Sequence, residues 1–319
     1  MLNQKTTVQQ MIRRIGLLAM MALSLAGCSA TRVETTTGNW GTPVTEADML
    51  QAVQRPNACC RLNFTKHLAG TWQVPLSGLL NLKNPKAVAA GLKDRDEPIE
   101  IYVYSLQHPT KGSFLVDSGL AETLRDPATN KDISSLVKRA MNTDKLVTRT
   151  TTGEIINSLN GIDGVFLTHL HLDHILGLQD IATTVPVYVG PGEAQLSAFM
   201  NLFTQGTTDR LLGKVDQLLE WPFNDAQILD VFGDSSLFAI KAPGHTPGTT
   251  AYLANTTRGL HLMIGDVTHT RWGWEHSVEP GTFSHDVEAS AASLDYIKRL
   301  ADQLPNLQVH PGHQSLSSQ

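Results

Sequence analysis

The sequence predicts an α/β protein, because strand-like segments alternate with helical segments from about residue 97 onward. The strand-like segments are short and rich in β-branched and aromatic residues. They cover 99–104, 113–116, 162–168, 185–189, 237–241, 249–253, 260–264 and 307–309. With 319 residues and a 41% hydrophobic content, the chain is long enough for one large core or two modest domains.

The clearest helix is predicted over 285–304. Its apolar residues recur at spacings of three and four and would form one face of the helix. These residues are Val287, Ala291, Leu294, Ile297, Ala301 and Leu304. Ser284 is the expected N-cap, and Pro305 is expected to stop the helix.

Residues 1–27 have the features of a secretory signal. They contain three basic residues and no acidic one, and the apolar run at 15–26 is too short to span a bilayer. Leu25-Ala26-Gly27-Cys28 resembles a bacterial lipobox, in which the cysteine is lipidated and becomes the new N-terminus. The alternative is ordinary cleavage after Ala26 or Ala30. The residue after the cysteine is Ser29 and not Asp, which in Gram-negative lipoproteins usually goes with the outer membrane. We therefore expect an exported protein anchored through Cys28 on the periplasmic side of a Gram-negative outer membrane.

Three further segments complete the predicted organisation. Residues 28–45 are polar and Thr-rich, which favours a flexible tether. Residues 46–96 mix short apolar pieces with Pro and Gly, and are predicted to form an irregular N-terminal extension packed on the domain. Residues 97–319 would form the functional domain. Cys59 and Cys60 are given no catalytic role.

The charge argues against a nucleic-acid partner. The full chain has a formal net charge of −5, and losing the three basic residues of the leader makes the mature chain more acidic, at −8. Such a chain is poorly suited to neutralising phosphates. Its 12 histidines against 3 cysteines indicate that any bound metal has imidazole and carboxylate ligands.

A dense group of such ligands follows the predicted strand at 162–168. The sequence Thr168-His169-Leu170-His171-Leu172-Asp173-His174 places imidazoles and a carboxylate where a strand gives way to a helix. On a turn, His169 and His171 can converge on one ion while Asp173 and His174 face a neighbouring ion. This donor set suits zinc, and also iron or manganese.

The string HLHLDH resembles the H-x-H-x-D-H motif of the metallo-β-lactamase superfamily. The companion motifs follow in the family's order: Asp117 in LVDSG, His245 in APGHTPG, Asp266 in IGD, and a final histidine in VHPGH. The resemblance covers residues 97–319. It implies an αββα four-layer sandwich, in which two mixed β-sheets lie between outer helices and the site lies at one edge.

The same resemblance implies two divalent ions, for which zinc is the first expectation. The first ion is expected on His169, His171 and His245. The second is expected on Asp173, His174 and His313, with His310 as the alternative to His313. Asp266 would bridge the ions. Asp117 would support the metal loop without being a ligand.

The implied activity is hydrolysis by a hydroxide shared between the two ions, with Asp173 orienting the nucleophile and delivering a proton. The segment 265–299 most resembles the N-acyl-homoserine lactonase-like branch, so the expected substrate is a lactone or another ester. A metallo-β-lactamase stays open as a second possibility, although such enzymes generally carry Cys or Ser where Asp266 stands. A phosphodiester or organophosphate hydrolase and a non-catalytic metal-binding lipoprotein also stay open.

Three side chains that follow Asp266 in the sequence are expected to contact the substrate. His269 stands where such lactonases often have a tyrosine, and it could donate a hydrogen bond to the substrate carbonyl. Trp272 and Trp274 follow on the same segment and could wall an apolar acyl-binding pocket. Packing within the domain is the alternative role for both tryptophans. The oligomeric state is not predicted.

Overall fold

The computed structural model describes residues 28–54, 61–213 and 215–316. The predicted signal peptide, together with Cys59 and Cys60, lies outside these residues. Within the described ranges, no helix combines the length and the apolar character needed to cross a bilayer.

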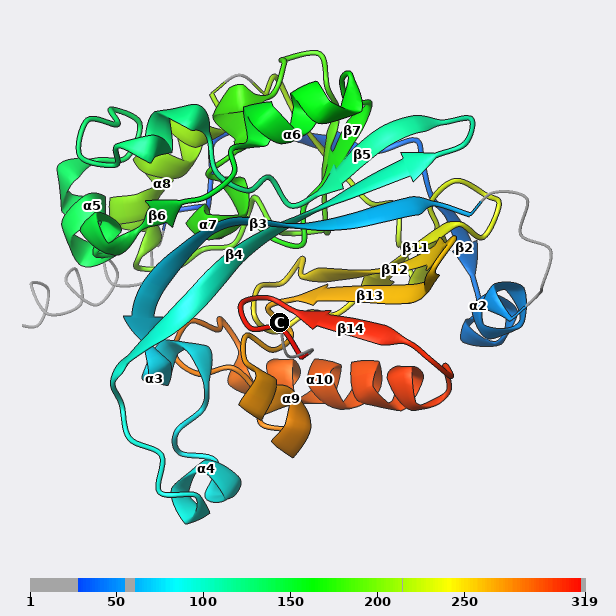
Figure 1. Cartoon of the computed structure of the whole chain (residues 1–319). Coiled ribbons are helices and arrows are strands. Elements are labelled where there is room, and N and C mark those ends of the chain that lie inside the picture. Colours follow the sequence, from blue (N-terminus) through cyan, green and yellow to red (C-terminus); the bar gives the residue numbers. More distant parts are fainter. Residues whose placement is uncertain (1–27, 55–60, 214, 317–319) are drawn as a thin grey trace, which may run out of the picture.

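Two β-sheets lie face to face, and helices cover their outer faces (Figure 1). On the outer side of the first sheet lie α6 (Thr152–Leu159) and α8 (Asn201–Leu211). On the outer side of the second lie α9 (Arg271–His276) and α10 (Val287–Asp302). The predicted αββα sandwich is therefore confirmed.

The first sheet has eight strands, in the order β1, β9, β8, β7, β5, β4, β3, β6. Their bounds are β1 (Thr35–Thr37), β9 (Leu218–Glu220), β8 (Val187–Val189), β7 (Gly164–Phe166), β5 (Gly112–Val116), β4 (Asp96–His108), β3 (Asn63–Pro75) and β6 (Val147–Thr148). The run from β5 through β7, β8 and β9 to β1 is parallel, whereas β3, β4 and β5 pair antiparallel.

The second sheet has six strands, in the order β14, β13, β12, β11, β10, β2. Their bounds are β14 (Gln308–Pro311), β13 (Gly259–Gly265), β12 (Thr250–Thr256), β11 (Leu237–Lys241), β10 (Ile228–Asp230) and β2 (Thr42–Val44). Only the β13–β14 pair of this sheet is parallel. Each segment predicted to be a strand overlaps one of the observed strands.

Short helices connect the strands. They are α2 (Glu46–Val53), α3 (Leu76–Leu79), α4 (Pro85–Ala89), α5 (Ser135–Ala140), α7 (Leu172–Ile175) and the 3-10 turns at Glu122–Arg125, Thr143–Lys145 and Leu178–Asp180. The long helix α10 begins later than predicted: Asp286, and not Ser284, is the N-cap and accepts from the backbone N–H of Ala289. Val287 lies at the start of the helix and is 36% exposed.

The prediction of an irregular extension over 46–96 is wrong, because residues 63–75 form the long strand β3. This strand has 13 residues and pairs antiparallel with β4 from Asn63 opposite Gln107 to Pro75 opposite Asp96. Its own sequence hides it, since it contains Gly70, shifts register between Leu68 and Gly70, and buries only part of each face. Pairing with a distant strand overrides the weak local preference.

The predicted tether is also wrong for much of its length. Within 28–45, β1 pairs with β9 at the edge of the first sheet, and β2 pairs with β10 at the edge of the second. The threonines that suggested a polar linker are β-branched, and such residues are well suited to edge strands.

Between the sheets lies a core rich in aromatic side chains, which includes Phe114, Phe166, Tyr188, Trp221 and Tyr252. The Tyr252 hydroxyl joins the two sheets: it accepts from Trp221 Nε1 at 2.9 Å and donates to the carbonyl oxygen of Leu167 at 2.9 Å. Leu167 immediately precedes the histidine-rich segment. This buried hydrogen bond therefore holds the start of that segment against the second sheet.

We expect Tyr252→Phe to lower the free energy of unfolding by about 1–3 kcal/mol, because it leaves a buried indole N–H and a carbonyl without partners. Tyr188→Phe is the matched control, since its hydroxyl donates to Asn39, an exposed residue that water can reach. Chemical denaturation of both variants tests the difference. Equal losses would contradict the role given to Tyr252.

Candidate metal centre

The histidine and aspartate side chains come from strands that end at one edge of the sandwich. Asp117 follows β5, the segment 168–174 follows β7, and Asp266 follows β13. His245 comes from the turn between β11 and β12, and His313 follows β14. Because β5 and β7 are parallel, as are β13 and β14, the ends of these pairs meet at the same edge. Residues far apart in sequence therefore converge there.

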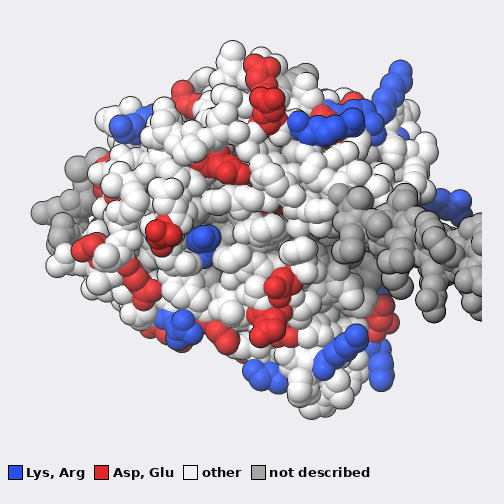
Figure 2. Space-filling view, turned by 180° about the vertical axis from the view of Figure 1, so that it is seen from behind, with Lys and Arg blue, Asp and Glu red and all other residues white. Residues whose placement is uncertain are grey.

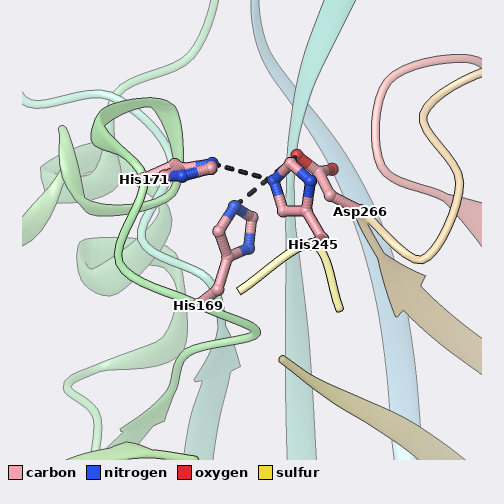
Figure 3. A group of neighbouring side chains, drawn as sticks. All are labelled: His169, His171, His245 and Asp266. Carbon is pink, nitrogen blue, oxygen red and sulfur yellow. Dashed lines mark hydrogen bonds and ion pairs between the residues drawn. The ribbon is translucent and has the colours of Figure 1, made fainter. Parts of the chain in front are cut away.

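Two groups of potential ligands form within this edge. His169, His171, His245 and Asp266 make the first, and Asp173, His174 and His313 make the second. Figure 3 shows the side chains of the first group pointing toward one another. The structure thus brings together every residue predicted to bind metal, in the two sets that the resemblance implied. His269 joins Asp266 and His313 in a further overlapping group.

Asp266 lies between the groups. Its Oδ2 is 3.3 Å from His245 Nε2, 3.5 Å from His169 Nε2 and 3.5 Å from His174 Nε2. Its Oδ1 is 3.3 Å from His313 Nε2. One carboxylate oxygen therefore faces rings of both groups, as expected of a bridging position.

The rings are held from behind by partners outside the cluster. His174 Nδ1 lies 2.8 Å from Asp117 Oδ2, while Asp117 Oδ1 accepts from the backbone N–H of Thr168 at 2.8 Å. His313 Nδ1 lies 3.0 Å from the carbonyl oxygen of Glu100. His245 Nδ1 lies 3.2 Å from the Ser284 hydroxyl. Each contact fixes one ring nitrogen and leaves Nε2 facing the centre.

The residues fit bound metal ions. His169 Nε2, His174 Nε2 and Asp266 Oδ1 are buried, and the protein offers them no hydrogen-bond partner. Leaving buried polar atoms unpaired costs free energy, and such atoms in a native fold need an explanation. Imidazole and carboxylate donors at this density suit zinc, iron or manganese. Coordination to ions would satisfy all three atoms.

Burial sets the protonation of the first group. It lowers the pKa of His169 well below the ordinary value, that of His171 to about 4 and that of His245 to about 3. These rings are therefore neutral at pH 7 and have a nitrogen lone pair free. His313 differs: burial opposes its charged form, but attraction to Asp266 and the hydrogen bond to Asp173 outweigh burial and raise its pKa to about 10. A metal ion must displace this proton.

The model of the metallo-beta-lactamase superfamily matches residues 97–300. The chain belongs to this superfamily. One curated relative is the N-acyl homoserine lactonase AttM of Azorhizobium caulinodans, with 29% identity over 99 residues, which is 30% of this chain and 37% of the relative. The chain thus matches well under two thirds of that protein's length.

Solved structures of the superfamily share the fold. A quorum-quenching N-acyl homoserine lactone lactonase aligns over 79% of this chain and 91% of its own, with a TM-score of 0.57 and 17% identity. The dizinc quorum-quenching lactonase AidC, in complex with a product, aligns over 79% of this chain and 87% of its own, with a TM-score of 0.52 and 16% identity. The predicted membership of the superfamily is confirmed.

Among the superfamily motifs of this chain, VHPGH contains two histidines with different surroundings. His313 Nε2 lies 3.2 Å from Asp173 Oδ2, inside the cluster. His310 instead lies 3.0 Å from His261 through their ring nitrogens and stacks near Phe64, with 5.4 Å between ring centroids. The structure therefore places His313, and not His310, among the potential ligands.

The three residues expected to meet substrate are not placed alike. His269 reaches the cluster, with Nε2 3.1 Å from Asp266 Oδ2. Trp272 stacks on His276 at 4.2 Å between ring centroids, and Trp274 lies under the ammonium of Lys298. These contacts are within α9 and between α9 and α10, so they support packing for both tryptophans. The prediction of an acyl pocket wall gains no support from them.

One residue of the site was missed in the sequence. Glu193 is 1% exposed, and its carboxylate accepts from the backbone N–H of Leu170 at 2.8 Å and from that of Gly248 at 3.0 Å. It thereby ties the H-x-H-x-D-H loop to the loop that carries His245. The two glycines of the surrounding turns were the available signal: a Cβ on Gly190 would lie 1.8 Å from the carbonyl oxygen of Gly248, so these backbones approach too closely for any side chain.

We expect Asp117→Asn to weaken metal binding about 10–100-fold, because a neutral amide accepts from His174 Nδ1 less strongly than the carboxylate does. Competition with a chromophoric chelator measures this affinity. Asp234→Asn is the matched control, since Asp234 makes the same kind of contact, 2.7 Å from Nε2 of His108, the last residue of β4, which is not among the potential metal ligands. Unchanged affinity in Asp117→Asn would show that the contact does not support the metal loop.

Proposed function

We propose that the protein is a dinuclear metal-dependent hydrolase that opens lactone rings. The observation that carries the proposal is the cluster of buried imidazoles around Asp266, which forms two groups of potential ligands joined by a third that overlaps the other two. Zinc is the proposed metal, because the donors are imidazole and carboxylate and the related lactonase AidC is a dizinc protein.

N-Acyl-homoserine lactones are the proposed substrate class. Support comes from two directions. Relatives named as lactonases of these compounds match in sequence and in fold. Asp266 lies between the two groups of potential ligands, where the superfamily resemblance implies that β-lactamases generally carry Cys or Ser. Turnover of different substrate classes distinguishes this activity from that of a metallo-β-lactamase or of a phosphodiester or organophosphate hydrolase.

When bound, two divalent ions supply a nucleophile at neutral pH and a Lewis acid for the carbonyl oxygen. Asp173 is placed to move the proton. Burial disfavours its charged form, but His174 and His313 outweigh this and keep its pKa below the ordinary range, so it is ionised. Its side chain is 17% exposed, against 3% for Asp266. Asp173 can therefore accept a proton at the centre and pass it to the leaving alkoxide.

His269 is proposed to contact the carbonyl oxygen of the substrate. Its Nδ1 lies 2.9 Å from the carbonyl oxygen of Leu79, so Nδ1 carries the proton donated in that contact. The other nitrogen, Nε2, lies 3.1 Å from Asp266 Oδ2 and faces the centre, where it is placed to contact the developing oxyanion. The same nitrogen lies within reach of a metal ion, in the group with Asp266 and His313, and would then be a further ligand.

For the cellular location, we propose export and lipidation at Cys28, with the domain held on the periplasmic side of the outer membrane. The lipobox-like sequence before Cys28 supports this. Cys28 is partly exposed and is a free thiol in the structure. Metabolic labelling with a palmitate analogue tests the anchor, because label should be lost in Cys28→Ala.

The proposed activity is tested by a panel of lactone, thioester, β-lactam and phosphodiester substrates on protein of measured metal content. We expect two ions per chain and the highest kcat/KM on N-acyl-homoserine lactones. His313→Gln should lose metal and activity, whereas His310→Gln should retain both, because only His313 lies in the cluster. Faster turnover of the β-lactam would replace the proposed function with that of a β-lactamase.

The role of His269 is tested by a pair of variants of similar volume. His269→Leu removes the donor and should lower kcat about 10²–10³-fold while both ions stay bound. His269→Gln retains a donor and should retain more of the rate. Metal content is the second readout: if His269→Leu binds fewer ions, His269 is a ligand and not a donor.

A further inference from the structure

Four large apolar side chains are exposed together at the start of α8, and we call them the apolar patch. They are Phe199, Met200, Leu202 and Phe203, with exposed fractions of 70%, 58%, 50% and 44%. The rings of Phe199 and Phe203 contact each other edge to face, with centroids 5.7 Å apart. Exposed apolar residues clustered in this way mark an interaction surface.

The chain around the apolar patch carries no charge. From Ala194 to Thr208 the sequence contains no Lys, Arg, Asp or Glu. Of the flanking carboxylates, Glu193 is buried, and Asp209 is paired with Arg32 at 2.7 Å. Charges are common elsewhere: Figure 2 shows Asp and Glu side chains scattered among Lys and Arg over the back of the molecule. Moving this segment out of water would therefore desolvate no unpaired charge.

The same segment binds the chain at Cys28. The carbonyl oxygen of Cys28 accepts from the backbone N–H of Ala198 at 3.4 Å and from Asn201 Nδ2 at 3.0 Å. Gln205 Nε2 donates to the carbonyl oxygen of Ser29 at 2.9 Å. The proposed site of lipidation is thus fixed beside the apolar patch. In the sequence, Cys28 also comes directly after the apolar run of residues 15–26 and Gly27.

We infer that the apolar patch docks on the lipid bilayer beside the acyl chains of Cys28. This rests on the proposed lipidation for the anchor, while the patch is an independent observation. A lipid chain alone attaches a domain without orienting it, and apolar side chains that enter the interface add a second point of contact. The hydrogen bonds at Cys28 leave little slack between the two points, so the domain would lie directly on the membrane.

The insertion can be measured on the processed protein in vesicles of phosphatidylethanolamine and phosphatidylglycerol, with and without brominated acyl chains. Phe199→Trp should add emission that the brominated lipid quenches. Val88→Trp is the matched control, because Val88 is 63% exposed on α4, away from the patch. Equal quenching at both positions, or none at Phe199→Trp, would overturn the inference. A second copy covering the patch would give dimers and no quenching, with the same consequence.

A second comparison separates docking from lipidation. In the full chain carrying Cys28→Ala, adding Phe199→Ser and Phe203→Ser should lower the vesicle partition coefficient by at least about tenfold, since two exposed phenyl rings are lost. Both proteins share the same leader, so the difference reports the apolar patch alone. Equal partitioning sinks the docking inference even if palmitate labels Cys28. If the two partition coefficients differ clearly but the chain that retains Cys28 takes up no palmitate label, the docking inference is supported and the proposed lipid anchor is rejected.

Discussion

The structure depends on one buried carboxylate. Asp266 is 2% exposed and faces imidazole nitrogens contributed by β7, β11, β13 and β14 through the segments that follow them. Burial disfavours its charge, but His269 and His313 outweigh burial and hold its pKa well below the ordinary range. Several strands must therefore end side by side around one negative charge, and the two sheets must pack closely enough to bury this carboxylate.

The supports of the cluster come from both sheets. Asp117 follows β5 and Glu100 lies in β4, both in the first sheet. Ser284 lies just before α10, the helix that covers the second sheet. Glu193 then ties two loops of the site together. Ala198, whose backbone N–H binds Cys28, lies five residues after Glu193 in the chain. The segment that supports the metal loop through Glu193 therefore continues directly into the apolar patch. The site and the proposed membrane surface share one segment.

The ligands could be predicted from the sequence because their residue types and local spacing carry the chemistry. The choice of His313 over His310 rested on the resemblance alone, because both histidines stand in VHPGH; in the structure His310 lies within β14 and His313 follows it. The contacts of His269 with Leu79 and of His313 with Glu100 could not be predicted, because they are made to backbone carbonyl oxygens, which every residue type has. Strand β3 escaped prediction because Gly70 interrupts it and its faces are only partly buried, so its own sequence shows no clear alternation.

The pairing of β3 with β4 has a consequence for where this domain can be cut. The superfamily match begins at residue 97, but β4 is hydrogen-bonded along its length to β3, which lies entirely before that residue. A recombinant fragment started at the match boundary would leave one side of the long strand β4 unpaired at the edge of the first sheet. Such an edge invites intermolecular pairing. Its insolubility would say nothing about the metal centre, and the smallest workable fragment has to include β3.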